Sequence, residues 1–279
     1  MGRFSDVLFS ADFDHTLSGP DGSVPQRNVD AIQAFIAEGG RFCINSGRSV
    51  PLLRSKVELV PVNAPCLCFN GAACYDFAAE KLHYAVPLPA HTPQLIEQIR
   101  ALGDDFGIEL QCLDRHYFYR ASAREQFLRK QGVISLPAEA NFPEFAMKLV
   151  LYAALDADVL SAKATPEQSV RMEQLKAQLE ALCGESCYVV RSLPLQFEIG
   201  PRNCDKGSAA RSLADSLGRH VLVCAGDAPN DLQMLQAADF AFVPSDADEE
   251  ILALPGVHVA APSGEGAVAD AIERLKALL

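Results

Sequence analysis

Two carboxylates near the N-terminus are the residues of this chain best placed to do chemistry. Asp12 and Asp14 follow the short apolar run at positions 7–9. In an extended segment alternate side chains lie on one face, so both carboxylates can point into one space. Such charges repel unless a cation or a shared proton relieves them, and the oxygen-seeking Mg²⁺ is the usual cation. The pair predicts a metal-assisted site at the end of a buried strand. An acidic turn with no ligand remains the alternative unless the chain supplies further site residues.

Three further polar motifs lie where a predicted strand ends or a predicted helix begins. They are Ser46-Gly47-Arg48 after a strand at 41–45, Lys206-Gly207 at the start of a helix at 206–217, and Gly226-Asp227 after a strand at 220–225. In open parallel sheets, ligands bind outside the carboxyl ends of the strands. Segments far apart in the sequence are therefore expected to meet at one sheet edge.

The residue types in these motifs are those that phosphoryl transfer requires. One carboxylate can attack phosphorus, and a second can protonate the leaving oxygen and later deprotonate water. A divalent cation offsets the negative charge, while a hydroxyl, a lysine and backbone N–H groups hold the phosphate oxygens. Lys206 stands at a helix start, where the helix dipole disfavours a cation unless an anion is bound. This placement favours an anion site.

The order of the predicted elements indicates a parallel α/β sheet with an inserted second domain. Apolar strands at positions 7–9, 41–45 and 65–69 alternate with helices at 28–38 and 51–60. The same rhythm returns after position 205, with a last helix at 267–279. Between them the pattern becomes mixed, with a capped helix that starts at Thr165. We therefore predict a Rossmann-like core domain over 1–86 and 194–279 and an α+β cap domain over 87–193.

The motifs carry a resemblance to a known family. D-F-D-H-T-L, N-S-G-R, D-K-G and G-D-A-P-N-D, in this order, resemble the four motifs of the haloacid dehalogenase-like (HAD) phosphohydrolases. N-G-A after the third strand, F-E-I-G-P-R-N-C-D-K-G, and G-D-A-P-N-D-L-Q-M-L resemble the Cof-type branch. The resemblance covers essentially the whole core. The insert is similar only in position, size and mixed character. The resemblance as a whole implies the HAD fold with a cap domain that sets substrate specificity.

The resemblance also implies roles for individual residues. Asp12 would be the nucleophile and Asp14 the general acid and base. The Mg²⁺ ligands would be Asp12, the backbone carbonyl of Asp14, and Asp227, with Asp231 in or just behind that set. Ser46 and Lys206 would complete the catalytic residues. The residues expected to bind phosphate or substrate are Phe13, Ser46, Gly47, Arg48, Asn70, Gly71, Lys206 and Asn230.

Two positions depart from the family pattern. His15 stands where many relatives have Gly. After Phe240, relatives commonly continue with a small-residue turn and an Asn-Ala pair that supports the acidic loop, whereas this chain has V-P-S-D-A-D-E-E at 243–250. The support of the acidic loop is therefore open at this stage.

In the cap, five basic residues lie on or beside predicted strands. Substrate contact and a solvated strand edge are both open for them, and Lys148 is favoured because M-K-L-V-L-Y resembles a recurring Cof-type cap strand. The five are Arg115, His116, Arg120, Lys148 and Arg191.

Composition excludes several classes of protein. The chain has 279 residues, 49% of them hydrophobic and 22% charged, which is typical of a globular protein. Its net charge of −12 disfavours nucleic-acid and anionic-membrane partners. No run approaches the roughly 20 apolar residues of a membrane helix, and no signal peptide is evident. The nine cysteines are an odd number within mostly apolar runs, which favours reduced, buried thiols and a cytoplasmic protein. A monomer or a small homo-oligomer is expected.

The sequence thus predicts a Mg²⁺-dependent phosphatase that hydrolyses a small phosphorylated metabolite, such as a sugar phosphate, through an aspartyl-phosphate. Two alternatives stay open. A phosphosugar mutase would use the same aspartyl-phosphate chemistry. A non-catalytic protein that binds a phosphorylated ligand would use the fold without turnover, although a pure binder has no need of Asp14 beside Asp12.

Overall fold

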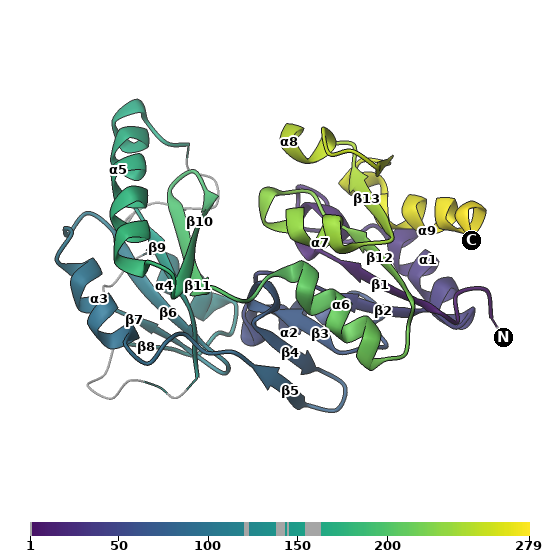
Figure 1. Ribbon diagram of the computed structural model, residues 1–279, viewed down its shortest axis with the longest axis horizontal. Coiled ribbons are helices and arrows are strands. Elements are labelled where there is room, and N and C mark those ends of the chain that lie inside the picture. The colour runs from purple at the N-terminus through teal and green to yellow at the C-terminus, as the bar shows by residue number, and fades with distance from the viewer. Residues whose placement is uncertain (1, 120–122, 138–142, 144, 154–162) are drawn as a thin grey trace. The chain divides into compact units, whose positions relative to one another are not determined.

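The computed structural model describes residues 2–119, 123–137, 143, 145–153 and 163–279, and it divides into two compact units (Figure 1). The first unit comprises Met1–Arg48, Leu53–Tyr84 and Cys204–Leu279. The second comprises Ser49–Leu52 and Ala85–Asn203. Each unit is described separately.

The first unit is built on a five-stranded parallel sheet in the order β14-β13-β12-β1-β2. Every residue of β1 is buried, as expected for a central strand covered on both faces. Its neighbours are β2, the next strand of the chain, and β12, which comes far later in the sequence, and because both pair parallel with β1 the three strand ends meet at one edge. The bounds are β1 Val7–Ala11, β2 Arg41–Ile44, β12 Val221–Ala225, β13 Phe240–Pro244 and β14 Val257–Ala260.

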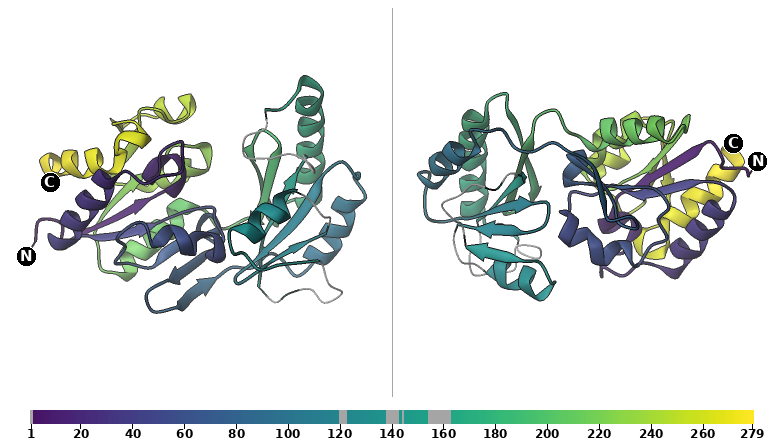
Figure 2. Two further views of the ribbon diagram at one scale, coloured as in Figure 1. Left: turned by 180° about the vertical axis from the view of Figure 1, so that it is seen from behind. Right: turned by 90° about the horizontal axis from the view of Figure 1, so that it is seen from below.

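Helices cover both faces of this sheet because successive side chains of β1 point in opposite directions. Phe9 packs edge-on against Phe35 of α1, with ring centroids 6.0 Å apart. Leu8 belongs to the apolar cluster that includes residues of α6 and α7. α1 and α9 contact each other, as do α6 and α7 (Figures 1 and 2). The bounds are α1 Gln26–Ala37, α6 Lys206–Ser216, α7 Leu232–Ala237, α8 Glu249–Leu252 and α9 Ala267–Leu278.

A three-stranded sheet, β3-β4-β5, completes the first unit. β3 pairs antiparallel with β4, and a single parallel bridge between Asn45 and Leu67 joins β3 to the end of β2. The end of β3 therefore lies at the same edge of the unit as the ends of β1 and β2. The bounds are β3 Cys66–Cys68, β4 Ala73–Asp76 and β5 Lys81–Ala85.

The second unit contains a six-stranded sheet in the order β10-β11-β9-β6-β7-β8. Its pairs are antiparallel except that β7 and β8 are parallel. Residues 108 and 110 of β6 enter an apolar core with α3 and α5, whereas the alternate residues Glu109 and Gln111 are polar and buried. The strands are β6 Gly107–Cys112, β7 His116–Phe118, β8 Ser135–Pro137, β9 Ala146–Tyr152, β10 Cys187–Leu193 and β11 Gln196–Pro201.

The helices of the second unit are α3 Thr92–Arg100, α4 Ala123–Lys130 and α5 Pro166–Cys183. The capping box expected at Thr165 is confirmed, because its side chain accepts from the backbone N–H of Gln168 and the Gln168 side chain accepts from the N–H of Thr165. The helix α2, Val50–Val57, has its first residues in the second unit and the rest in the first.

The chain returns to the first unit about ten residues later than the predicted boundary. The sequence places residues 194–203 in the core, whereas the structure groups them with the second unit. The physical reason is β11, which pairs with both β9 and β10. Among the described residues, every helix is too short or too polar to cross a membrane.

Candidate active site

The nucleophile motif lies in the turn that leaves β1. The backbone N–H of Asp12 donates to the carbonyl of Ala225 at 2.9 Å, which fixes the end of β1 against β12. The turn Phe13–Leu17 then reverses the chain, and Phe13 is buried within it. His15 has φ 55°, a left-handed conformation that Gly adopts more easily. His15 is exposed, so its side chain points away from the buried turn residues.

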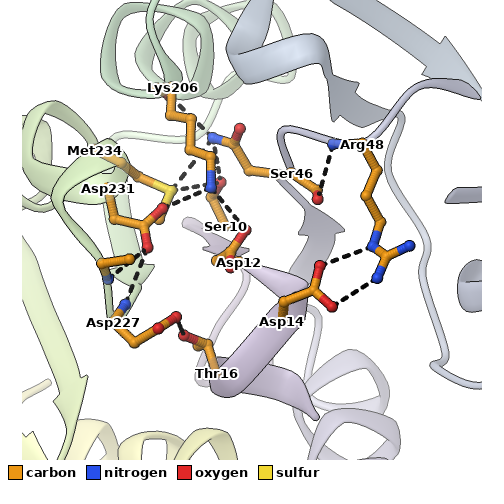
Figure 3. A network of polar contacts seen from close by, with 12 residues as sticks. Ser10, Asp12, Asp14, Thr16, Ser46, Arg48, Lys206, Asp227, Asp231 and Met234 are labelled. Carbon is orange, nitrogen blue, oxygen red and sulfur yellow. Dashed lines mark hydrogen bonds and ion pairs between the residues drawn. The ribbon is translucent and has the colours of Figure 1, made fainter. Parts of the chain in front are cut away.

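Lys206 connects two of the predicted carboxylates. Its Nζ lies 2.6 Å from Oδ1 of Asp12 and 2.6 Å from Oδ1 of Asp231, and the lysine is almost fully buried (Figure 3). Burial lowers the pKa of the ammonium, but the two carboxylates outweigh it and hold the pKa above its usual value. The Lys206 ammonium therefore stays charged. Asp205 caps α6, because its side chain accepts from the backbone N–H groups of Gly207 and Ser208.

Three carboxylates converge here. Asp12, Asp227 and Asp231 each offer an oxygen within 4.8 Å of the others. Burial and then mutual repulsion raise the pKa of Asp227 to about 8. Burial, only partly offset by Lys206, raises the pKa of Asp12 to about 7. Oxygen ligands with excess negative charge are what a hard divalent cation such as Mg²⁺ requires, so the donor set fits that ion.

The acidic loop after β12 is held by backbone donors. Oδ2 of Asp231 accepts from the N–H groups of Asp227 and Ala228 at 3.0 and 3.2 Å. A Cβ on Gly226 would lie 2.6 Å from the Asp231 side chain, so this position requires glycine. The carbonyl of Asp227 accepts from the N–H of Asp248 at 2.9 Å. The unusual segment 243–250 thus supports the loop through its backbone.

Asp14 faces a different partner from Asp12. Its two oxygens accept from Nε and Nη2 of Arg48, each at 2.7 Å (Figure 3). Burial raises the pKa of this carboxyl, but the Arg48 hydrogen bonds and charge outweigh it and hold the pKa below its usual value. Arg48, which the sequence predicts to bind phosphate or substrate, is placed on Asp14 in this structure.

The segment after β2 packs against the N-G-A turn. Ser46 donates its N–H to the carbonyl of Leu67 and accepts from the N–H of Asn70 on its own carbonyl. A Cβ on Gly47 would lie 2.8 Å from Oδ1 of Asn70, and one on Gly71 would lie 2.4 Å from the carbonyl of Asp205. The structure thus brings these predicted residues together. Asn230 lies in the turn Pro229–Asp231, directly before Asp231.

Sequence reasoning missed two buried supports of the site. The amide of Asn45 donates to the carbonyl of Lys206 at 2.9 Å and to the hydroxyl of Ser10 at 3.2 Å, and so holds the first turn of α6. Thr16 donates its hydroxyl to Oδ1 of Asp227 at 2.7 Å. The sequence did offer a signal for both residues. Asn45 is a polar residue at the end of an apolar strand, and Thr16 is a polar residue in the turn after one.

The basic cap residues have partners of their own. Arg115 pairs with Asp114, Arg191 with Glu173, and Lys148 with Glu198 at 3.0 Å. The fourth residue, His116, is fully buried beside Ser49. Arg120 lies outside the described residues.

With this geometry in place, comparison with known proteins assigns the family. The family model for haloacid dehalogenase-like hydrolases matches residues 9–272. The chain belongs to that family. The Cof-type resemblance of the sequence is confirmed, and the chain is a phosphoric monoester hydrolase.

Relatives and solved structures match over nearly the whole chain. A haloacid dehalogenase-like hydrolase from Bacteroides thetaiotaomicron is similar with a TM-score of 0.80 and 18% identity, over 96% of this chain and 98% of that one. The HAD subclass IIB sugar phosphatase BT4131 is similar with a TM-score of 0.75 and 16% identity, over 96% and 98%. The pyridoxal phosphate phosphatase YbhA of Escherichia coli is 22% identical over 90% of this chain and 92% of its own. The predicted α/β fold with a parallel central sheet is confirmed.

Proposed function

We propose that this HAD hydrolase is a Mg²⁺-dependent phosphatase of small phosphorylated metabolites that forms an aspartyl-phosphate on Asp12. The observation that carries the proposal is the position of Lys206, whose ammonium lies 2.6 Å from the carboxylates of both Asp12 and Asp231. A buried cation at the start of a helix, next to a nucleophilic carboxylate, is suited to hold a phosphate oxygen during attack.

In the first step, an oxygen of Asp12 attacks phosphorus and the ester bond to the leaving oxygen breaks. Asp14 gives that oxygen a proton, so that an alcohol leaves. In the second step, Asp14 takes a proton from water, the water oxygen attacks phosphorus, and the Asp12–phosphorus bond breaks to release phosphate. Lys206 and Ser46 hold the non-bridging oxygens throughout.

Arg48 sets the starting state of Asp14. With Arg48 bound to both oxygens, Asp14 is ionised and can act only as a base. To act as the acid of the first step, Asp14 takes up a proton from solvent and shifts one oxygen from Arg48 to the leaving oxygen. In the second step the ionised carboxylate acts as a base, and Arg48 orients it for that role.

Asp12, Asp227 and Asp231 would hold the Mg²⁺ ion, together with the backbone carbonyl of Asp14. When bound, the ion supplies positive charge that lowers repulsion between the nucleophile and the phosphate. The raised pKa values of Asp12 and Asp227 support this assignment, because both carboxylates are short of positive charge in the protein alone.

A small, polar phosphomonoester is the substrate class that we propose. The family membership and the printed names of relatives, a sugar phosphatase and a pyridoxal phosphate phosphatase, support it. The net charge of −12 is consistent with a substrate other than nucleic acid. We further propose a cytoplasmic protein that needs no membrane partner.

The test is phosphate release from a panel of sugar phosphates, pyridoxal phosphate and para-nitrophenyl phosphate, with and without Mg²⁺. Asp12→Asn is expected to lower kcat by at least about 10³-fold while the protein stays folded, since the amide cannot attack phosphorus. The matched control is Asp30→Asn on the exposed face of α1, which should retain full activity. An active Asp12→Asn protein would exclude the proposed nucleophile.

The same assay separates the alternatives. Isomerised sugar phosphate without free phosphate would identify a mutase. Tight binding of phosphate esters with no turnover under any divalent cation would identify a binding protein. Either result would replace the proposed phosphatase.

A further inference from the structure

Three fully buried polar side chains form a chain of contacts in the second unit. Nε2 of His116 lies 2.8 Å from the hydroxyl of Ser49, and Nδ1 of the same ring lies 2.7 Å from Oε1 of Glu109. All three side chains have no solvent exposure. Gln111 donates to Glu109 at 2.9 Å, and Nε of Arg124 lies 3.7 Å from its other oxygen. These contacts are therefore part of the buried interior of the second unit.

The carboxylate at the end of this chain is ionised. Burial raises the pKa of Glu109, but His116, Arg124 and Gln111 outweigh it and hold the pKa at about 2. A carboxylate only accepts hydrogen bonds, so Nδ1 of His116 carries a proton and faces it. Nε2 is thereby directed at Ser49. Both ring nitrogens of His116 therefore face a buried partner, Ser49 on one side and Glu109 on the other.

The order serine, histidine, carboxylate is also that of a nucleophilic triad, but burial excludes this use. A substrate must reach a nucleophilic hydroxyl, and Ser49 is completely inaccessible. What Ser49 does instead follows from its neighbours in sequence. It directly follows Arg48, and its hydroxyl also accepts from the N–H of Leu52 at 3.4 Å, in the first turn of α2.

We propose that Glu109 and His116 are positioning residues that act through Ser49 on Arg48, and so on the Asp14 carboxylate. The chain passes from the first unit to the second at the peptide bond between Arg48 and Ser49. The carbonyl of Arg48, which is part of that peptide bond, accepts from the N–H of Phe69 at 3.0 Å, and the N–H of Arg48 donates to the hydroxyl of Ser46 at 3.2 Å. Arg48 is thus held by these backbone contacts and by the Ser49 anchor that follows it. The Arg48 guanidinium makes two hydrogen bonds to Asp14, and this geometry requires that the Arg48 backbone be held in place.

This inference rests on the proposed function for its activity readout, but its geometry stands independently. Shifting a residue that orients a catalytic group typically costs ten- to a hundredfold in rate. We expect Ser49→Ala and His116→Phe each to lower kcat for para-nitrophenyl phosphate roughly tenfold, with KM changed about twofold or less. His116→Gln keeps a polar group near the Nε2 position and is expected to recover part of the loss.

The decisive experiment is a double-mutant cycle with Arg48. If Ser49 acts through Arg48, then Ser49→Ala should lower kcat in the wild-type background and leave it unchanged in an Arg48→Ala background. Equal losses in both backgrounds would overturn the proposal. The matched control is Ser186→Ala, because the Ser186 hydroxyl also lies near an imidazole, 3.4 Å from Nε2 of His91, but away from Arg48. A similar loss of kcat in this control would also overturn it.

A second readout does not depend on turnover. Hydrogen exchange of the Arg48 amide should accelerate about fivefold or more in His116→Phe, measured where circular dichroism shows the fold intact. Unchanged exchange would overturn the positioning role even if the wild type released no phosphate. Conversely, faster exchange without any wild-type turnover would reject the proposed function but support the positioning role of His116.

Discussion

Two carboxylates, one in each unit, have pKa values shifted in opposite directions; Asp227 is half-buried and Glu109 is fully buried. Asp227 in the first unit has its pKa raised to about 8, whereas Glu109 in the second has its pKa lowered to about 2. Burial acts in the same direction on both. The difference lies in their neighbours, because Asp227 faces two other carboxylates and Glu109 faces His116 and Arg124.

The comparison separates a site short of positive charge from one that is balanced. In the first arrangement the carboxylates repel one another, and a bound cation can reduce that repulsion. Such unbalanced charge is typical of a functional site. The second is satisfied by the protein itself and serves structure and orientation. The ratio of cationic to anionic neighbours, more than burial, distinguishes the two.

Removing the cation of the first site should have the largest effect. Lys206→Met keeps the length of the side chain but leaves Asp12 and Asp231 without their shared ammonium. We expect kcat to fall at least about 10³-fold and the free energy of unfolding to fall by roughly 3–5 kcal/mol. Urea denaturation and phosphate release measure the two effects. Wild-type activity in this variant would show that the charge balance of the site is immaterial.

Breaking the balanced cluster should destabilise the second unit without changing the three carboxylates proposed to hold Mg²⁺, Asp12, Asp227 and Asp231. Glu109→Gln removes the charge that His116 and Arg124 face, at a cost of about 3 kcal/mol. Hydrogen exchange resolved to β6 and β7 should show the loss. Mg²⁺ affinity, measured by calorimetry, should remain that of the wild type, and a weakened affinity would contradict the separation.

The two units should also respond oppositely to pH in metal-free protein. An acid with a raised pKa holds its proton more tightly when folded, so the first unit should lose stability as pH rises from about 4 to about 8. An acid with a lowered pKa contributes stability above its ordinary pKa, so the second unit should lose it as pH falls from about 4.5 towards 2. Native-state hydrogen exchange at pH 5, 6.5 and 8 measures the first trend.

Asp227→Asn sharpens this pH comparison. The amide keeps an oxygen that can accept from Thr16 but carries no charge, so the metal-free protein should become more stable at pH 8 by a few kcal/mol. The Mg²⁺-induced rise in Tm should shrink to near zero. A variant that is destabilised at pH 8, or that keeps the full Mg²⁺ response, would reject the charge argument.

Deleting one neutral donor from each carboxylate should have the smallest effect. Thr16→Val removes the hydroxyl that donates to Asp227, and Gln111→Leu removes the amide that donates to Glu109. Each should cost about 1 kcal/mol. Thermal unfolding with and without Mg²⁺ should show that only Thr16→Val alters the response to the ion.

The sequence predicted most of the core because its signals there are local. Apolar runs ending in polar motifs placed β1, β2 and β12, and the topology of parallel sheets implied that their ends meet. The convergence of Asp12 and Asp227 followed from that topology, and the family resemblance added Asp231. The Thr165 capping box was equally local.

The contacts that the sequence did not predict join residues far apart in the chain, and no local sequence pattern indicates such pairs. The Arg48–Asp14 pair joins two motifs whose residues were each assigned to other tasks. The contact of Ser49 with His116 spans 67 residues, and neither residue stands in a recognisable motif with the other. The return point to the core was misplaced because β11 follows β10 as a hairpin, and strand pairing decides which unit a strand joins.

The double contact of Lys206 has a consequence for the end of each turnover. When inorganic phosphate departs, the ammonium does not become a bare buried charge, since Asp12 and Asp231 are already within 2.6 Å of it. The protein therefore competes with its own product for the same cation. Under the proposed function, this internal replacement weakens product inhibition and favours rapid release.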